Sequence, residues 1–302
     1  MFNYYFFKTF LSLFAIYLTA GLGNIITMKT SDINLGSEGQ IYIAGFIAAI
    51  FLNTFKTLPP PLALPLCFLV SGVASSLVCL LSAYLKTSKG ITFLLSSFII
   101  SCAIIPLLNE LVSGKFRTTE SPLLATAFIL QKFRYSYIIN IFISVILAIL
   151  VYLFFKKSRI GVEIGLYGKA REFTVFMGID EPKILYTSAI LTGFLHGFSG
   201  AMVVCSMHYT CYNGFASSMG WNALSAAIIA RFSPLKLIIS SLAMSFLISS
   251  SEQIALFNNF NFDITTLVQA IVIFVIAFPF CKEIIFEHKK QKLENKGDSD
   301  DK

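Results

Sequence analysis

The stretch Ser31-Asp32-Ile33-Asn34-Leu35-Gly36-Ser37-Glu38-Gly39-Gln40-Ile41-Tyr42-Ile43-Ala44-Gly45 decides the fold of this chain. It lies between two apolar segments, yet it contains glycines, amides and a carboxylate. At the depth of a bilayer, such groups are tolerated only where protein or a water-filled cavity surrounds them. The stretch therefore predicts an interrupted helix that lines a pathway across a membrane.

The composition around this stretch is that of a membrane protein. Of 302 residues, 56% are apolar and 13% are charged, against about 25% charged in soluble domains. Segments without Asp, Glu, Lys or Arg approach the length of about 20 residues that crosses a bilayer, and they cover residues 61–84, 91–109, 136–155 and 184–207. We therefore expect an all-α polytopic membrane bundle.

About nine transmembrane helices are expected, with a range of eight to ten. The apolar segments lie near residues 9–28, 39–55, 61–85, 91–113, 136–155, 184–207, 212–230, 234–250 and 264–281. Residues 1–281 would form a single transmembrane domain, and residues 282–302 a polar cytoplasmic tail. The cysteines fall mostly inside apolar segments, with no spacing typical of a disulfide framework.

The basic residues predict the orientation of the chain. The net charge is +7, with 23 Lys and Arg, and cytoplasmic loops of membrane proteins are enriched in both. If residues 156–183 are cytoplasmic, the N-terminus lies outside, the C-terminus lies inside, and only six basic residues face outward, namely Lys8, Lys56, Lys115, Arg117, Lys132 and Arg134. Basic cytoplasmic loops thus explain the excess of Lys and Arg, and no binding of nucleic acid is expected. Four of these six residues fall in the loop 114–135, which is the least consistent part of this assignment.

The segment Asn34-Leu35-Gly36-Ser37-Glu38-Gly39 resembles the permease subunits of nucleoside and simple-sugar ABC importers, within the ribose and branched-chain amino acid permease superfamily. The resemblance extends to residues 161–179 and 220–234. It implies two inverted halves, with broken helices at matching positions near residues 31–45 and 212–222. Such pairs mark transport sites near the membrane midplane.

The two broken segments supply the candidate residues for the substrate pathway, which are Asn34, Glu38, Gln40, Tyr42, Trp221 and Asn222. Aromatic faces can stack on a flat ring or a sugar, and amides can orient it. Glu38 has two interpretations. It is either a solute acceptor or, as we favour, a carboxylate that satisfies N–H groups at the start of its own helix, where Asn34 and Ser37 also resemble capping residues.

The loop 156–183 is expected to contain a short amphipathic helix, with apolar residues at spacings of three and four. In the resembling permeases this loop docks on the ATPase. The residues expected to couple transport to the ATPase are Gly161, Tyr167, Gly168, Arg171, Glu172 and Gly178. The chain departs from the family at Glu163 and Gly165, where arginines are typical, which suggests that a second permease supplies those charges.

Two further polar groups are interpreted without a catalytic or metal role. Cys205-x-x-His208-x-x-Cys211 has three donors but no visible fourth ligand, so no metal site is predicted. His196 lies beside Gly193, Gly197 and Gly200, a pattern that favours close helix packing, with the imidazole bonded to a backbone carbonyl.

The function expected from these features is that of the permease subunit of an ATP-driven importer in the inner membrane. The solute would be nucleoside-like or a simple sugar. A P-loop is absent, so ATP would be bound by partner ATPase subunits, and the chain would need no cofactor of its own. By the resemblance, a second permease and an extracytoplasmic substrate-binding protein complete the complex. The alternatives are an ion-coupled secondary transporter that acts alone and a permease for another solute such as riboflavin. No catalytic motif favours an enzyme.

Overall fold

The computed structural model describes residues 4–119, 122–258, 266–272 and 274–275. The chain divides into two compact units, residues 1–249 and 250–302. In the second unit, the described residues are helical and comprise the end of one long helix with residues 266–272 and 274–275. The predicted tail 282–302 lies outside the described residues, as do residues 264–265, 273 and 276–281 of the predicted span 264–281.

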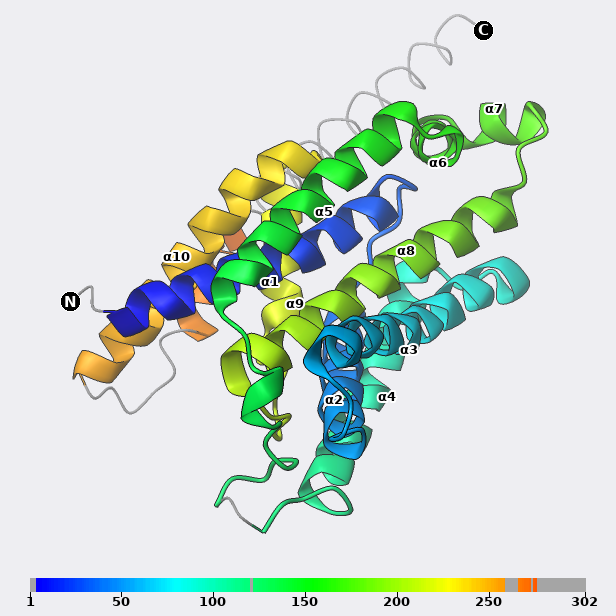
Figure 1. The fold of residues 1–302 in the computed structure, drawn as a ribbon. Helices are drawn as coiled ribbons and strands as arrows, with labels where there is room; N and C mark the ends of the chain where they lie inside the picture. The colour runs from blue at the N-terminus through cyan, green and yellow to red at the C-terminus, as the bar shows by residue number, and fades with distance from the viewer. Residues whose placement is uncertain (1–3, 120–121, 259–265, 273, 276–302) are drawn as a thin grey trace, which may run out of the picture. The chain divides into compact units, whose positions relative to one another are not determined.

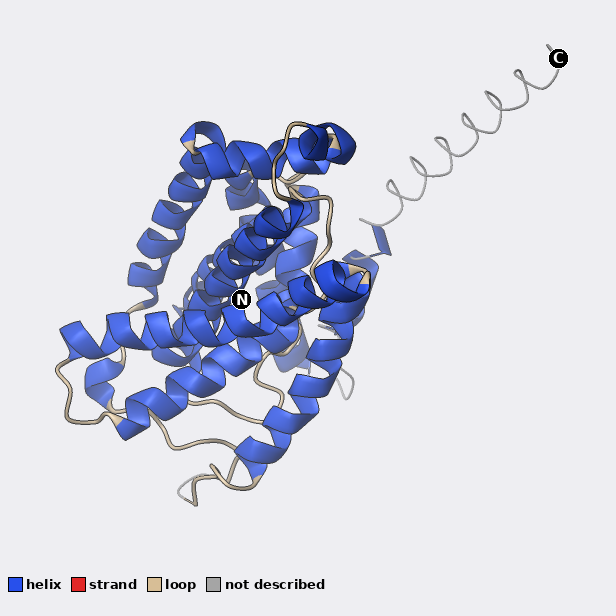
Figure 2. Ribbon diagram, turned by 90° about the vertical axis from the view of Figure 1, so that its right-hand side faces the viewer, coloured by secondary structure: helices blue, strands red, loops and turns tan. Residues whose placement is uncertain are grey.

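Helices make up the regular secondary structure throughout the described part of the chain (Figures 1 and 2). The long apolar ones follow the predicted spans closely. The α-helices are α1 (Tyr4–Met28), α2 (Ser37–Thr54), α3 (Pro60–Lys89), α4 (Phe93–Ser113), α5 (Tyr137–Lys157), α6 (Arg159–Lys169), α7 (Arg171–Phe176), α8 (Glu181–Met202), α9 (Met219–Ile229) and α10 (Pro234–Asn258). A 3-10 turn, η1 (Gln131–Phe133), precedes α5, and a π-helical turn, η2 (Val203–His208), continues α8.

Six of these helices are long and apolar enough to cross a membrane, whereas α2 and α9 are shorter. With 11 residues, α9 rises about 16 Å, roughly half of a hydrocarbon core. The predicted span 212–230 is therefore wrong as a continuous helix. The chain turns repeatedly before α9, because Gly214, Ser217 and Ser218 all adopt positive φ.

α1 forms the centre of the first unit, where α5, α8 and α9 pack around it (Figure 1). Its sequence is apolar on every side, which is the pattern of a buried helix. Most of its residues from Ser12 onward are inaccessible to solvent. By contrast, α5 leaves apolar side chains such as Phe142 and Ile146 exposed. α1 is thus a core helix and α5 a peripheral one.

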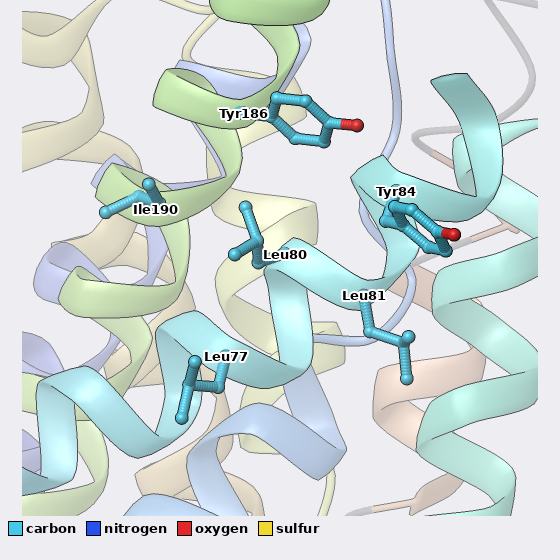
Figure 3. Close-up of a pocket in the computed structure, with 6 residues that line it drawn as sticks. All are labelled: Leu77, Leu80, Leu81, Tyr84, Tyr186 and Ile190. Atoms are coloured by element: carbon cyan, nitrogen blue, oxygen red, sulfur yellow. The ribbon is translucent and has the colours of Figure 1, made fainter. Parts of the chain in front are cut away.

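α3 and α8 pack closely along each other. A Cβ added at Gly193 or Gly197 would meet the backbone of Ser76 or Gly72 at 2.5 and 2.4 Å. Small residues let the two backbones approach, as the sequence predicts for this part of α8. On the outer side of this pair, Leu77, Leu80, Leu81, Tyr84, Tyr186 and Ile190 line an apolar pocket (Figure 3).

The connecting segments of the first unit gather at its two ends. At one end, Lys29 lies over the ring of Phe155, and Ser31 bonds to Gly168. At the other end, the loop 114–135 pairs with residues 209–213 through backbone bonds, including Thr126 N to Cys211 O at 2.8 Å. The loop 114–135, whose basic residues agreed least with the predicted orientation, is therefore held against the second broken segment.

Candidate functional site

The two broken segments meet inside the first unit, at the first turns of α2 and α9. Residues 29–36 approach this junction from the end that carries α6, and residues 209–218 approach it from the opposite end. A Cβ added at Gly220 would lie 2.5 Å from the backbone nitrogen of Glu38. The paired, oppositely directed broken segments expected from the sequence are thus brought into direct contact.

The Glu38 side chain closes this junction. One carboxylate oxygen accepts a hydrogen bond from the Ser218 N–H at 2.6 Å, and the other accepts from the Gly220 N–H at 2.8 Å. N–H groups in the first turn of a helix lack partners within the helix and carry positive partial charge. Glu38 therefore stabilises the start of α9 while it belongs to the first turn of α2.

Glu38 bonds N–H groups at the start of a helix, as expected of a structural carboxylate, but these groups belong to α9 and not to its own helix α2. α2 begins after Gly36, and no side chain of its own caps it. Asn34 instead accepts a bond from Gly36 N within the preceding turn, at 2.8 Å. The Gly39 N–H at the start of α2 donates to Ser101 of α4, at 2.9 Å. The caps come from other helices because the interrupted segment is buried between them.

Asn34 and Gln40 form a buried polar chain with His196. The Asn34 amide donates to Gln40 Oε1 at 3.1 Å, and Gln40 Oε1 lies 2.6 Å from His196 Nδ1. The other ring nitrogen of His196 is 3.0 Å from the carbonyl oxygen of Ala20. The expected bond from His196 to a backbone carbonyl is confirmed, and the chain joins α1, α2 and α8.

The other predicted pathway residues contact different neighbours. Tyr42 donates to Asn109 of α4 at 2.6 Å, and its ring stacks on Phe215 with 5.9 Å between centroids. Asn222 donates to the Tyr17 hydroxyl at 3.1 Å. Of the six predicted residues, Glu38 and Trp221 are partly exposed, while Asn34, Gln40, Tyr42 and Asn222 are buried. The six do not form one cluster.

The predicted coupling loop folds into two helices instead of one. The chain bends at Ala170, with φ −149°, between α6 and α7. The predicted single apolar stripe is therefore split. Ile164, Tyr167 and Thr174 are buried. Phe173 and Met177, which continue the apolar spacing of three and four, are exposed.

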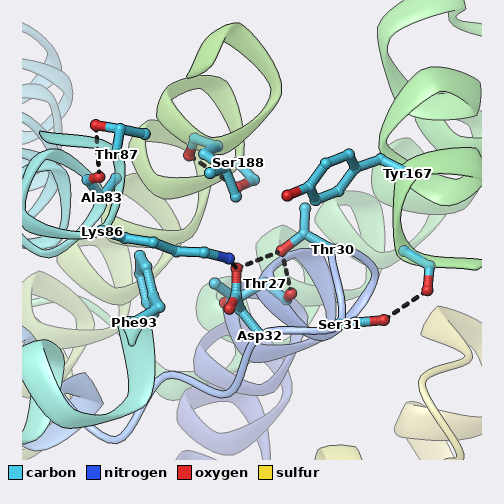
Figure 4. A network of polar contacts seen from close by, with 12 residues as sticks. Thr27, Thr30, Ser31, Asp32, Ala83, Lys86, Thr87, Phe93, Tyr167 and Ser188 are labelled. Atoms are coloured by element: carbon cyan, nitrogen blue, oxygen red, sulfur yellow. Dashed lines mark hydrogen bonds and ion pairs between the residues drawn. The ribbon is translucent and has the colours of Figure 1, made fainter. Parts of the chain in front are cut away.

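Residues 29–36, which lead from α1 into the junction, contact α6 and α3 at Ser31 and Asp32 (Figure 4). Ser31 Oγ donates to the carbonyl of Gly168 at 2.5 Å, and a Cβ added at Gly168 would fall on the carbonyl oxygen of Lys29. Asp32 forms an ion pair with Lys86 of α3 at 2.6 Å. These contacts place Gly168, one of the residues expected to couple transport to the ATPase, directly against the segment that leads into α2.

Two of the remaining coupling residues, Tyr167 and Arg171, contact the start of α8. Tyr167 donates to Glu181 Oε1 at 2.7 Å, and Arg171 pairs with the same oxygen at 2.6 Å. Burial, followed by the neighbouring Glu181 carboxylate, raises the pKa of Tyr167, so its hydroxyl stays a donor at physiological pH. Gly161 lies against the backbone of Phe154, Gly178 has φ +79°, and Glu172 is exposed.

Comparison with known proteins decides the family. Residues 6–277 match the model of the branched-chain amino acid transport system / permease component family. The chain belongs to this family. Its resemblance to permease subunits of ABC importers is thereby confirmed, and the apolar helices identify a multi-pass membrane protein.

Several curated relatives of the permease carry names of transport components. It is 31% identical over 273 residues to a probable riboflavin import permease protein of Treponema pallidum (strain Nichols), covering 87% of this chain and 71% of the relative. It is 20% identical over 289 residues to a guanosine ABC transporter permease protein of Bacillus subtilis (strain 168), covering 92% and 83%. A nucleoside ABC transporter permease protein of Lactococcus lactis subsp. cremoris (strain MG1363) is 22% identical over 292 residues, covering 90% and 79%. No solved structure matches the permease.

Sequence reasoning missed the polar side chains of α4 that hold both broken segments. Ser97 accepts from Leu35 N at 3.2 Å, and Ser101 accepts from Gly39 N. Asn109 accepts from Tyr42 and, at 3.1 Å, from Gly214 N. The sequence did contain a signal for these three residues. They lie four and eight positions apart in an apolar span, and polar residues with such a helical spacing are expected to face protein.

The Asp32–Lys86 pair yields a testable prediction for the permease. Both side chains are largely buried, with 13% and 20% exposed. Removing one partner of such a pair leaves an uncompensated charge, so Lys86→Met is expected to destabilise the permease by about 2 kcal/mol, with partial recovery in Asp32→Asn/Lys86→Met. Thermal unfolding of the purified complex measures the difference.

The pair Arg159 and Glu163 of α6 provides the control for this test. Their 2.8 Å contact spans one turn, and the Arg159 side chain is 91% exposed. Exposed pairs contribute little, so Arg159→Gln is expected to change stability by less than about 0.5 kcal/mol. Equal melting temperatures for Arg159→Gln and Lys86→Met would contradict the structural role of the Asp32–Lys86 pair.

Proposed function

We propose that this permease subunit imports a small solute in which a sugar or polyol is joined to a flat ring, with riboflavin as the first candidate. The relative with 31% identity is named for riboflavin import, and others are named for guanosine or nucleosides. Riboflavin and nucleosides share a planar heterocycle with a five-carbon polyol or pentose. Simple sugars form the second class of candidates, because a relative from Haloferax volcanii is named a glucose ABC transporter permease protein.

The proposed pathway follows the junction of the two broken segments. Glu38 and Trp221 are its partly exposed members, and the single Trp offers an aromatic face for a flat ring. Asn24 on α1 and the amide oxygen of Asn222 on α9 are buried, with no hydrogen-bond partner among the described residues. Buried polar atoms without protein partners favour contact with water or solute. Asn34, Gln40 and Tyr42 would support the wall through their buried contacts.

The proposed energy source is a pair of ATPase subunits that dock on the loop 156–183. Around α7, Phe173, Phe176 and Met177 are 56%, 91% and 57% exposed. Such an apolar patch on a short helix fits the groove of a partner protein. Movement of α6 would then reach the junction through Gly168, Ser31 and the rest of residues 29–36, and would alternate access to the pathway.

The proposed orientation places the loop 156–183 and the C-terminus in the cytoplasm and the N-terminus outside. Lys29, Lys86 and α6 share one end of the first unit, which supports grouping their charges on one side. A substrate-binding protein would then deliver solute at the opposite end, and a related permease would complete the membrane part of the complex.

Uptake in cells tests the proposal. The permease would be expressed with its partner subunits in a riboflavin-auxotrophic bacterium that lacks its own uptake system. We expect ATP-dependent accumulation of labelled riboflavin, with guanosine and ribose as competitors that rank the alternatives. Accumulation of labelled guanosine or ribose without riboflavin would reassign the solute. Ion-driven uptake by the permease alone in liposomes would contradict ATP coupling.

A further inference from the structure

A polar pocket of about 500 Å³ lies at the end of the first unit opposite α6. It is formed where the start of α1, the turn before α5 and the end of η2 come together. Tyr209, in the left-handed conformation that ends η2, is one of its lining residues. The junction residues Glu38 and Trp221 do not line it, so the pocket is separate from the proposed pathway.

Two cations converge on the ring of Tyr209. The guanidinium carbon of Arg134 lies 4.7 Å from the ring centroid, and the Lys8 ammonium lies 5.8 Å from it. Within the described residues, neither cation forms an ion pair and no carboxylate lines the pocket. Two like charges near one ring repel each other, so an anion between them would be strongly attracted.

The donors in the pocket are suited to a phosphate group. Arg134 uses Nε and Nη2 to hold the Ile129 carbonyl at 3.2 and 3.0 Å, which fixes the guanidinium while some of its five N–H groups stay available. Lys8 adds an ammonium, and Tyr4, Tyr137 and Ser136 add hydroxyl groups to the lining. Arginine and lysine are the side chains that bind phosphate oxygens most strongly.

The surroundings favour a phosphate that is attached to lipid tails. The first turns of α5, which begins at the lining residue Tyr137, expose Ile138, Ile139 and Phe142, at 49%, 47% and 66%. The exposed Tyr4, Tyr5 and Phe7 of α1 add aromatic rings, which are typical of the membrane–water interface. We infer that this pocket binds the phosphate group of an anionic phospholipid, whose acyl chains lie along α5.

Lipid retention by the assembled complex tests this inference. The complex would be placed in nanodiscs of phosphatidylcholine with an equal amount of phosphatidylglycerol, and the lipids retained after extraction would be counted by native mass spectrometry. We expect the wild-type permease to retain phosphatidylglycerol at least tenfold over phosphatidylcholine. Lys8→Gln/Arg134→Gln is expected to lose this preference.

Lys132→Gln is the matched control, because Lys132 lies two residues from Arg134 but donates to the Leu58 carbonyl at 3.2 Å and does not line the pocket. It should retain phosphatidylglycerol like the wild type. Equal retention of both lipids by the wild type, which needs no variant to fold, would overturn the inference. Displacement of the lipid by millimolar inorganic phosphate would also overturn it, in favour of a site for a soluble anion.

Discussion

Glu38→Gln is expected to lower the abundance and the melting temperature of the permease, and to reduce uptake only in proportion. The carboxylate accepts from Ser218 N at 2.6 Å and from Gly220 N at 2.8 Å. A glutamine can accept only one of these bonds, and its amide group then faces the other N–H. The loss of one charge-assisted bond and one buried N–H left without an acceptor together cost about 3 kcal/mol.

Uptake normalised to the amount of permease in the membrane separates this role from contact with the solute. If Glu38 binds solute, Glu38→Gln would reduce normalised uptake while the melting temperature stays unchanged, and that result would contradict the capping role. Glu110→Gln makes the same chemical change at an exposed carboxyl group of α4. It is expected to leave abundance and melting temperature at wild-type values, because no helix start depends on it.

The sequence predicts most of the helices because charged side chains are costly in lipid and are therefore restricted to loops. Runs without charge identify α3, α4, α5 and α8 within a few residues. The breaks near Gly36 and Gly214 are also predicted, because only a protein-enclosed segment tolerates so many helix breakers at that depth. The length of α9 was not predicted, because Tyr212, Phe215 and Ala216 extend the apolar segment toward its N-terminus although the chain turns at Gly214, Ser217 and Ser218.

The partners of the site residues could not be predicted because they are distant in sequence. Glu38 bonds to residues 180 and 182 positions away, and no local pattern specifies which helix start its carboxylate will reach. The same holds for Ser101 with Gly39, which are 62 positions apart. Residue type limits the kind of bond that is formed, whereas the tertiary arrangement selects the partner.

Gly168→Ala is expected to uncouple ATP hydrolysis from uptake. The added methyl group would fall on the carbonyl oxygen of Lys29, close to the Ser31 nitrogen, where both neighbours are backbone. Overpacking of this kind costs about 1 to 3 kcal/mol, so α6 is expected to move away from residues 29–36 and to lose the Ser31 bond. A contact worth about 1.4 kcal/mol changes an equilibrium tenfold, and uptake is expected to fall by about that factor while ATP hydrolysis continues.

Gly165→Ala is the matched control, because it adds the same methyl group to the same helix where no atom lies within 4 Å. Both variants exchange glycine for alanine in α6, where alanine favours the helix, so a loss of uptake in Gly168→Ala alone reports the contact with Lys29. Uptake and ATP hydrolysis are measured on the same preparation of the assembled complex. If uptake and ATP hydrolysis by Gly168→Ala fall together, the contact supports assembly of the complex instead of coupling. If uptake and ATP hydrolysis by Gly168→Ala equal those of Gly165→Ala, the route from α6 through Ser31 to Glu38 does not carry the movement.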